Sequence, residues 1–299
     1  MRKGLSIFLI FFSLVVSGIS QRKGVSLALP ANVSEAKLDS KLMGHSMPYR
    51  VILPAGYAKA AAKRFRVIYL LHGLTGHYPN WTTLGTLPKS AEAFNFILVT
   101  PEGDNGWYND SPTITNAKYE SYIIKELIPE IDAKYRTVND RKGRAIAGLS
   151  MGGYGALKFG LKYPQMFSLV GSFSGAIFAP TFTSQSFSVF GQSFSVPFLE
   201  IITRTTTDAF GPPGSASRTE NDIFSIVRST DPERSKSLPF IYLDCGTEDI
   251  LLQSNREFAT LLLEKKIPHE FRQLPGGHTW PYWNKQVVEF LNLSERILK

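Results

Sequence analysis

The sequence is poor in cysteine and in clustered basic charge, and each shortage excludes a class of protein. Cys245 is the single cysteine among 299 residues, so no intramolecular disulfide can form. Because Cys245 stands in an apolar run, we expect a buried thiol without a chemical role. The net charge of +8 is spread thinly along the chain, which argues against nucleic-acid binding. No set of residues has the spacing of a metal site, so we expect no metal and no cofactor.

Long apolar runs are also missing, except near residue 1. Arg2 and Lys3 precede an apolar run at residues 5–16, and small residues follow at 17–20. This order is typical of a secretory signal peptide, and the run is shorter than the ~20 residues of a membrane-spanning helix. We expect residues 1–20 to be cleaved, which would give a secreted or periplasmic protein with no membrane span. An uncleaved amino-terminal anchor is the alternative.

The remainder of the chain has the composition of a globular protein, with 43% hydrophobic and 19% charged residues. Apolar segments alternate with amphipathic ones, a pattern that favours a single α/β domain over residues 21–299, with a mostly parallel sheet covered by helices on both faces. The polar start of this domain predicts a leader without regular structure up to residue 40. Predicted strands follow at residues 46–54 (an edge strand), 65–71, 94–101, 142–149, 167–175, 238–245 and 269–275.

A G-x-S-x-G pattern, Gly148-Leu-Ser150-Met-Gly152, lies between an apolar strand and a helical segment. Glycines at both ends allow the strand and the helix to approach each other through a very tight turn. Ser150 then projects from the apex, at a helix start where free N–H groups favour negative charge. The pattern therefore predicts a nucleophilic serine.

Two other loops are predicted at the same end of the sheet. The loop after strand 65–71 contains Gly73 and Gly76, and it would offer the Leu74 N–H, together with the Met151 N–H, as an oxyanion hole. A simple glycine turn is the alternative for this loop. The polar and aromatic loop at residues 102–110 follows the next strand and would lie at the same ligand-binding edge.

A serine nucleophile needs a histidine base, and in a fold of this type the base follows the serine in the chain. Five histidines are present, and two of them, His269 and His278, follow Ser150. His269 opens a predicted strand, whereas His278 stands in the Gly-Gly loop beyond the end of that strand. His278 is therefore the predicted base.

The acid that orients the base should follow the strand at residues 238–245. Asp244 lies within that strand, too early to reach the active edge, whereas Glu248 and Asp249 both lie in the following loop. We favour Asp249, which precedes a helix and has the shorter carboxylate. Glu248 is the alternative.

An insertion at residues 176–221 follows a core strand and shows neither a sustained helical period nor a sustained strand period. We expect a cap over the site that sets substrate choice and contributes little to the stability of the core; a solvated surface loop is the alternative. The cap would turn apolar rings inward, and its phenylalanines are Phe178, Phe182, Phe187, Phe190, Phe194, Phe198 and Phe210.

Four motifs together resemble the putative-esterase family of α/β-hydrolases, over about residues 45–295. The motifs are YLLHGL at 69–74, GLSMGGYGA at 148–156, CGTED at 245–249 and PGGHTW at 275–280. This family includes S-formylglutathione hydrolase (esterase D), feruloyl and acetylxylan esterases, and the antigen 85 mycolyltransferases. The resemblance implies an α/β-hydrolase fold without a cofactor, and it implies site residues: Ser150 as nucleophile, Asp249 as acid, His278 as base, and the N–H groups of Leu74 and Met151 as the oxyanion hole.

The resemblance implies a serine carboxylic-ester hydrolase that forms an acyl-enzyme on Ser150. The expected partner is a small-molecule or polysaccharide-linked ester, such as an acyl or feruloyl ester. An acyltransferase that uses a sugar alcohol as acceptor is the alternative. A non-catalytic binding protein on the same scaffold would need a broken Ser-His-Asp set, and all three members are present. The signal-like residues 1–20 and the insertion depart from cytosolic S-formylglutathione hydrolases, so that substrate fits this chain poorly.

Overall fold

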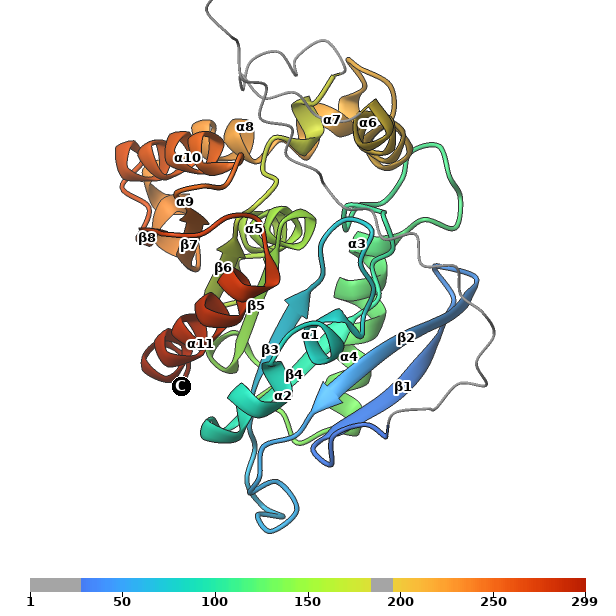
Figure 1. Cartoon of the computed structure of the whole chain (residues 1–299), viewed down its shortest axis with the longest axis vertical. Helices are drawn as coiled ribbons and strands as arrows, with labels where there is room; N and C mark the ends of the chain where they lie inside the picture. The colour runs from blue at the N-terminus through green and yellow to red at the C-terminus, as the bar shows by residue number, and fades with distance from the viewer. Residues whose placement is uncertain (1–27, 184–195) are drawn as a thin grey trace, which may run out of the picture.

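The computed structural model describes residues 28–183 and 196–299, so the predicted signal peptide at residues 1–20 lies outside the described residues. An open eight-stranded sheet forms the centre of the protein, in the order β1-β2-β4-β3-β5-β6-β7-β8 (Figure 1). β2 is antiparallel to both β1 and β4, and all other neighbouring strands are parallel. The strands are β1 (Val33–Ser40), β2 (His45–Ile52), β3 (Arg66–Leu71), β4 (Phe96–Pro101), β5 (Arg144–Leu149), β6 (Leu169–Phe173), β7 (Phe240–Gly246) and β8 (His269–Leu274).

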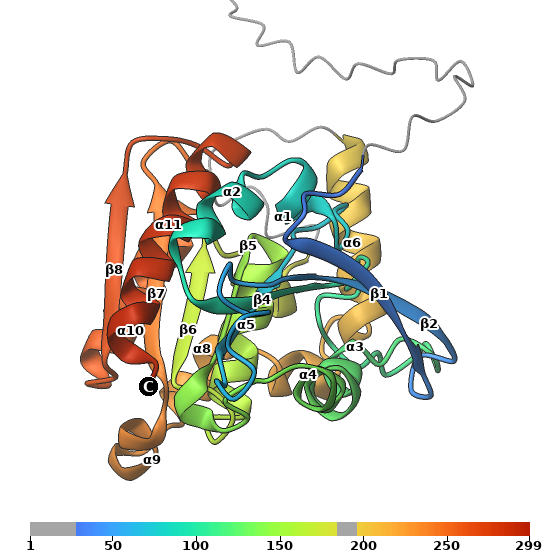
Figure 2. The same cartoon turned by 90° about the horizontal axis from the view of Figure 1, so that it is seen from below.

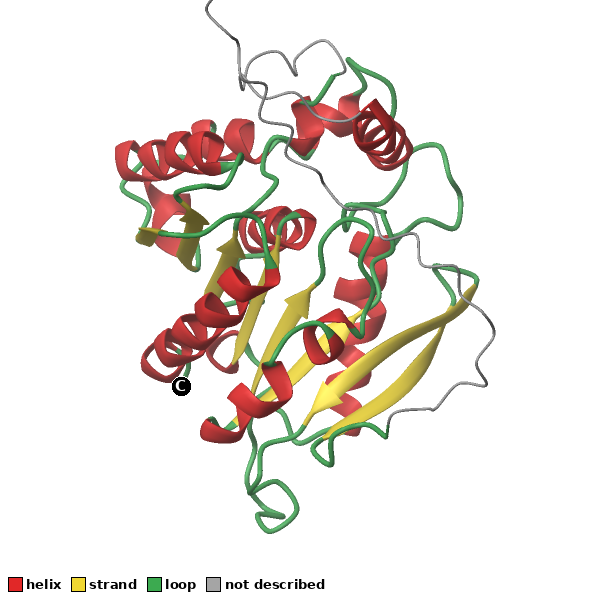
Figure 3. Ribbon diagram, in the orientation of Figure 1, coloured by secondary structure: helices red, strands yellow, loops and turns green. Residues whose placement is uncertain are grey.

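The central strands are apolar at successive positions because both faces of the sheet are buried. In β3, Val67, Tyr69 and Leu71 enter one apolar core, and the intervening Ile68 and Leu70 enter the other. Figure 3 shows the strands as one twisted layer between helices. The predicted mostly parallel sheet with helices on both faces is therefore confirmed.

The helices divide between the two faces of the sheet according to the core that each one joins. One face is covered by α1 (Asn80–Thr83), α2 (Leu87–Ser90) and α11 (Trp280–Ile297) (Figure 2). The other is covered by α3 (Tyr119–Tyr122), a π-helical turn (Ile123–Leu127), α4 (Ile128–Lys134), α5 (Met151–Lys162), α8 (Ile223–Arg228) and α10 (Leu252–Glu264). Short helical segments also occur at Ala91–Ala93, Arg141–Gly143, Ala179–Thr181 and α9 (Pro232–Ser237). Within residues 28–183 and 196–299, none of the helices combines the length and the apolar character that a membrane crossing requires.

The beginning of the domain differs from the prediction. Residues 33–40, expected as an irregular leader, form the edge strand β1, so β2 has a neighbour on each side. β1 was missed because its exposed positions carry polar residues such as Glu35 and Lys37, which suit the outer strand of a sheet and weaken the apolar pattern.

The insertion also differs from the prediction. It contains a 15-residue helix, α6 (Val196–Phe210), followed by α7 (Ala216–Glu220). Both lie at the end of the molecule toward which β3, β5 and β6 point (Figure 1). Phe210 is fully buried and belongs to the main apolar core, and buried Arg218 donates hydrogen bonds to the backbone carbonyls of Pro180 and Phe182. This part of the insertion therefore packs into the main core and does not lie over the site as a separate cap. Its small contribution to stability stays a prediction. Phe187, Phe190 and Phe194 lie outside the described residues.

Candidate active site

The turn between β5 and α5 holds Ser150 in a strained backbone conformation. Ser150 has a φ of 54°, which is rare for a residue with a side chain. The turn is too tight for other side chains, because a Cβ on Gly148 would lie 2.5 Å from the backbone carbonyl carbon of Gly152 and a Cβ on Gly152 would lie 2.5 Å from the Leu71 carbonyl oxygen. The Ser150 N–H donates to the Phe173 carbonyl at 2.9 Å, which ties the turn to β6.

A continuous chain of hydrogen bonds joins Ser150 to a histidine and a carboxylate. Nε2 of His278 lies 3.0 Å from Oγ of Ser150, and Nδ1 of His278 lies 2.9 Å from Oδ2 of Asp249. The other Asp249 oxygen accepts the Leu251 N–H at 2.9 Å, which fixes the carboxylate at the start of α10. Burial opposes ionisation of Asp249, but the hydrogen bond and the charge of His278 outweigh it, so the pKa of Asp249 lies below its ordinary value.

The structure distinguishes the candidate acids and bases. Asp249 is buried against His278, whereas the side chain of its neighbour Glu248 is exposed to solvent. Asp244 is buried within β7, as predicted. His269 is the first residue of β8, where its Nδ1 lies 2.8 Å from the Ile267 carbonyl oxygen. Of the candidates, the fold brings Asp249 and His278 together with Ser150.

The glycine loop, residues 72–78, lies beside Ser150 at the end of β3. Gly73 makes the closest approach, since a Cβ there would lie 3.3 Å from the Ser150 Cβ and 2.7 Å from a methyl carbon of Leu149. The next residue, Leu74, makes no backbone N–H hydrogen bond to any part of the chain that the structure describes. The Met151 N–H belongs to the first turn of α5, where no intrahelical acceptor exists. Two N–H groups next to Ser150 are thus available to a bound oxyanion.

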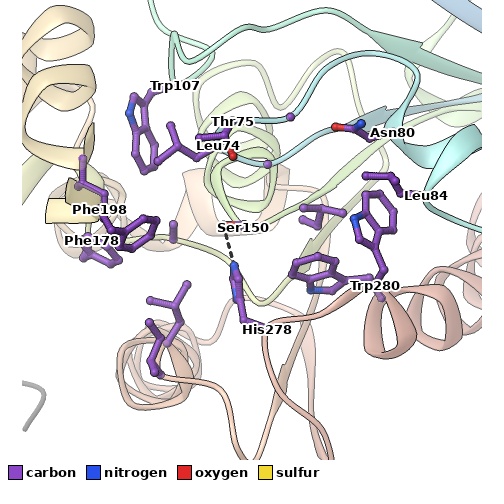
Figure 4. A pocket seen from close by; sticks show the side chains of 18 residues that line it. Leu74, Thr75, Asn80, Leu84, Trp107, Ser150, Phe178, Phe198, His278 and Trp280 are labelled. Carbon is purple, nitrogen blue, oxygen red and sulfur yellow. Dashed lines mark hydrogen bonds between the residues drawn. The ribbon is translucent and has the colours of Figure 1, made fainter. Parts of the chain in front are cut away.

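Ser150 and His278 open into a pocket of about 370 Å³ (Figure 4). On one side of the serine lie Trp107, Phe178 and Phe198; Asn80, Leu84 and Trp280 lie on the other. The sequence indicated the loop that carries Trp107 and the capping role of the two phenylalanines. It did not indicate that Trp280 lines the pocket, although Trp280 stands two residues after His278. The remaining lining residues are Gly73, Leu74, Thr75, Gly76, Leu149, Ala176, Ile202, Ile250, Leu251 and Trp283.

Two groups outside the pocket bear on the remaining predictions. Cys245 is fully buried, as predicted, and burial raises the pKa of its thiol well above the ordinary value. His77, Glu102 and Asp104 place one possible metal-ligand atom each within 4.8 Å of one another. Both oxygens of Glu102 already accept backbone N–H groups, so hydrogen bonds account for the position of this carboxylate without an ion.

Comparison with known proteins agrees with this architecture. The family model described as "Putative esterase" matches residues 40–292. The chain belongs to this esterase family. The esterase is 28% identical over 236 residues to an acetyl esterase from Caldicellulosiruptor saccharolyticus, a match that covers 79% of this chain and 85% of that protein. A solved structure of a ferulic acid esterase superposes with a TM-score of 0.73 at 30% identity, and the match covers 89% of this chain and 98% of that one.

Two mycobacterial proteins extend the comparison. Esterase Rv1288 from Mycobacterium tuberculosis is 28% identical over 264 residues, which cover 82% of this chain but 55% of that protein, so the esterase spans about half of that relative's length. MPT51 from the same organism superposes with a TM-score of 0.70 over 90% of this chain and 100% of that one; at 17% identity this likeness shows the fold alone. The esterase is thus a carboxylic ester hydrolase with the α/β-hydrolase fold.

Proposed function

We propose that this esterase cleaves its substrates through an acyl-enzyme intermediate on Ser150. The observation that carries the proposal is the continuous hydrogen-bonded chain from Asp249 through His278 to Ser150. A serine hydroxyl is a weak nucleophile near neutral pH and needs a base within hydrogen-bond reach, itself oriented by an acid. The chain supplies both partners at distances of 3.0 and 2.9 Å.

In the first half of the reaction, Oγ of Ser150 attacks the ester carbonyl carbon while Nε2 of His278 takes the hydroxyl proton. Negative charge moves to the carbonyl oxygen, where the N–H groups of Leu74 and Met151 donate hydrogen bonds. The carbon–oxygen bond to the alcohol then breaks, and His278 returns the proton to the leaving oxygen. Asp249 holds the imidazole ring in place and stabilises its transient positive charge.

In the second half, a water molecule attacks the acyl carbon of the Ser150 ester and gives a proton to His278. The bond to the serine oxygen breaks, Ser150 recovers its proton, and the carboxylic acid leaves. An alcohol in place of water would transfer the acyl group instead. Hydrolysis is the reaction we propose, because the similar acetyl and ferulic acid esterases carry that activity in their names.

For the substrate we propose an ester of a short or aromatic acyl group with an alcohol on a polysaccharide. The pocket of about 370 Å³ is within the range that holds small ligands. Its lining is mostly apolar, with Trp107, Phe178 and Phe198 grouped on one side of Ser150 (Figure 4). Such a surface suits an acetyl group or a flat aromatic ring, and the similarity to an acetyl esterase and a ferulic acid esterase supports the same range.

A panel of esters tests this proposal. We expect turnover of p-nitrophenyl acetate and methyl ferulate, with much slower turnover of a p-nitrophenyl ester of ten or more carbons. Release of ferulate or acetate from an acylated xylan oligosaccharide would extend the result to the proposed alcohol. A preference for long acyl chains would overturn the assignment of the acyl group. Transfer to an added sugar that exceeds hydrolysis would overturn the assignment of water as the acceptor.

We also propose that the esterase is exported from the cytoplasm, with cleavage near residue 20. The support is the order of basic, apolar and small residues at positions 2–20. Expression of the full chain and of a variant without residues 2–20 tests this. We expect activity outside the cytoplasm for the full chain alone, with a new amino terminus found by sequencing near residue 21. Activity retained in the cytoplasm by an uncleaved full chain would contradict export.

A further inference from the structure

One buried carboxylate is hydrogen-bonded to the glycine loop but does not line the pocket. Glu102 follows β4, and its side chain is 7% exposed. Burial would raise the pKa of Glu102, but its hydrogen bonds to His72 and to backbone N–H groups lower the pKa to about 2. Glu102 is therefore ionised near neutral pH, and its hydrogen bonds stabilise the negative charge.

Glu102 contacts both ends of the glycine loop. At the beginning of the loop, Oε1 of Glu102 lies 3.1 Å from Nε2 of His72, and Nδ1 of the same ring lies 2.9 Å from the Gly73 carbonyl oxygen. At the end of the loop, Oε2 accepts the Tyr78 N–H at 3.3 Å and lies 3.3 Å from Nδ1 of His77. One side chain thus fixes the distance between the two ends of the loop.

The segment that carries Glu102 also holds the middle of the loop. Oδ1 of Asn105 accepts the Thr75 N–H at 2.7 Å, and Thr75 has a φ of 60°, a conformation that requires support. Glu102 orders its own segment in turn, since its Oε1 accepts the Asp104 N–H at 2.8 Å. The Gly103 N–H is shared between Oε1 of Glu102 at 3.0 Å and Nε2 of His72 at 2.9 Å. Residues 102–105 therefore form a preformed support under the glycine loop.

The position of the loop matters because of what Leu74 has to do. An oxyanion-hole donor works when it lies about 2.7–3.1 Å from the position of the developing negative charge, and a misplacement of about 1 Å can cost on the order of 100-fold in rate. Leu74 stands between Gly73 and Thr75, on a loop whose glycines give little stiffness of their own. The rigidity of the loop must therefore come from its contacts.

We propose that Glu102 is a positioning residue that holds the Leu74 N–H in place for the oxyanion, acting through His72 and the backbone of the glycine loop. This inference rests on the proposed acyl-enzyme mechanism. It assigns to Glu102 no contact with substrate. Loss of its charge is expected to slow the chemical step more than it weakens substrate binding.

Two carboxylates of similar type make a matched test. Glu126 also accepts backbone N–H groups of a loop, those of Lys41 at 3.1 Å and Leu42 at 3.3 Å, but that loop joins β1 to β2 and is not part of the pocket lining. Glu102→Gln and Glu126→Gln are compared for melting temperature, for kcat and KM with p-nitrophenyl acetate, and for the rate of labelling by a fluorophosphonate. We expect Glu102→Gln to lower kcat and the labelling rate by about 10- to 100-fold with KM within about threefold of wild type, the range for a displaced oxyanion donor. Glu126→Gln should stay within about twofold of wild type in both rates.

A second pair of variants keeps the proposal testable if Glu102→Gln does not fold. Asn105→Ala removes the acceptor of the Thr75 N–H, and Asn105→Asp keeps an oxygen there. We expect kcat to fall about tenfold in the first, the cost of a modest displacement of the loop, and to recover in the second. Wild-type rates in folded Glu102→Gln, or equal losses in the two Gln variants, would overturn the positioning role. If wild type itself is not labelled at Ser150, the proposed mechanism fails instead.

Discussion

One wall of the pocket is formed by backbone atoms and the other by side chains. The wall that carries Ser150 is backbone packed on backbone, where added Cβ atoms on Gly148 and Gly152 would lie 2.5 Å from main-chain atoms. The second wall, on one side of Ser150, consists of side chains that project from loops and from α6: Trp107, Phe178 and Phe198 (Figure 4). The first wall has almost no freedom to change, whereas the second can exchange one ring for another. We infer that the reaction is fixed by the first wall and the choice of ester by the second.

Removal of the nucleophile should have the largest effect and act through the first wall alone. We expect Ser150→Ala to lower kcat by at least about 10⁴-fold, because the attachment point of the acyl group is lost. The melting temperature should change little, since the Ser150 backbone is held by its own N–H and carbonyl groups. Mass spectrometry after fluorophosphonate treatment should find the label on Ser150 in wild type. A label on another residue, with activity retained in the variant, would refute the assignment.

The next largest effect should separate two adjacent carboxylates. We expect Asp249→Asn to lower kcat by about 10²- to 10⁴-fold, because an amide orients the histidine poorly and does not stabilise its positive charge. Glu248→Gln, one residue earlier and exposed, is the matched control and should stay within about twofold of wild type. Steady-state kinetics with p-nitrophenyl acetate measures both. Equal losses, or a larger loss in Glu248→Gln, would place the acid at Glu248.

Changes to the second wall should alter the choice between esters more than the rate of turnover. In Phe178→Ala and Phe198→Ala we expect the ratio of kcat/KM for methyl ferulate to that for p-nitrophenyl acetate to fall by about tenfold, the size of one or two lost apolar contacts. Phe182→Ala is the control, because Phe182 is buried in the same segment but does not line the pocket. It should destabilise the fold while leaving the ratio within about twofold. An unchanged ratio in all three variants would show that these rings do not select the acyl group.

The smallest expected effect is a loss of stability in acid, which involves the loop that carries Trp107 and not the turn that carries Ser150. The loop that carries Trp107 is held by fully buried Lys158, whose ammonium donates to Glu120 at 2.7 Å and to the Tyr108 carbonyl at 2.6 Å. Burial opposes ionisation of Glu120, but Lys158 and Lys162 lower its pKa from 4.5 to about 2. Glu120 therefore stabilises the fold above about pH 4.5, and this stabilisation is lost as the pH falls toward 2.

Urea unfolding between pH 7 and pH 3 measures this contribution. We expect the wild-type midpoint to decline below about pH 4.5 and the Glu120→Gln/Lys158→Met double variant to decline less steeply. The double change is used because removal of one member would leave a buried charge without its partner. Turnover of the double variant at pH 7 should stay within about threefold of wild type. Parallel declines would show that Glu120 is not a main source of acid sensitivity.

The sequence predicted the first wall better than the second, for a physical reason. Ser150, Gly148 and Gly152 act within five consecutive positions, and His278 and Asp249 follow strands whose apolar runs are clear. The helix α6 gave no periodic signal because its second half is rich in threonine, which disfavours helices on its own. There the helix is stabilised by local bonds, such as the Thr206 hydroxyl to the Ile202 carbonyl at 2.8 Å, and by packing.

The contacts of Glu102 show a different limit of sequence reasoning. The partners of this carboxylate are histidines 30 and 25 positions earlier and backbone N–H groups, and backbone groups leave no trace in a sequence. β1 was missed for yet another reason, because a strand at the edge of a sheet can carry polar residues on its exposed positions. In each case the structure of the segment depends on residues that are close in space but distant in the sequence.

The single buried cysteine offers a way to measure local unfolding of the sheet. Cys245 lies in β7, four residues before Asp249, and with no other thiol in the chain every reaction with a thiol reagent must occur there. A fully buried sulfur reacts only while its strand is locally unfolded. When the reagent reacts faster than the strand closes, the labelling rate equals the rate at which β7 opens. The opening rate of β7 can thus be measured in the native enzyme without mutation. A bound inhibitor that slows the labelling would show that occupation of the pocket stabilises the strand that leads to Asp249.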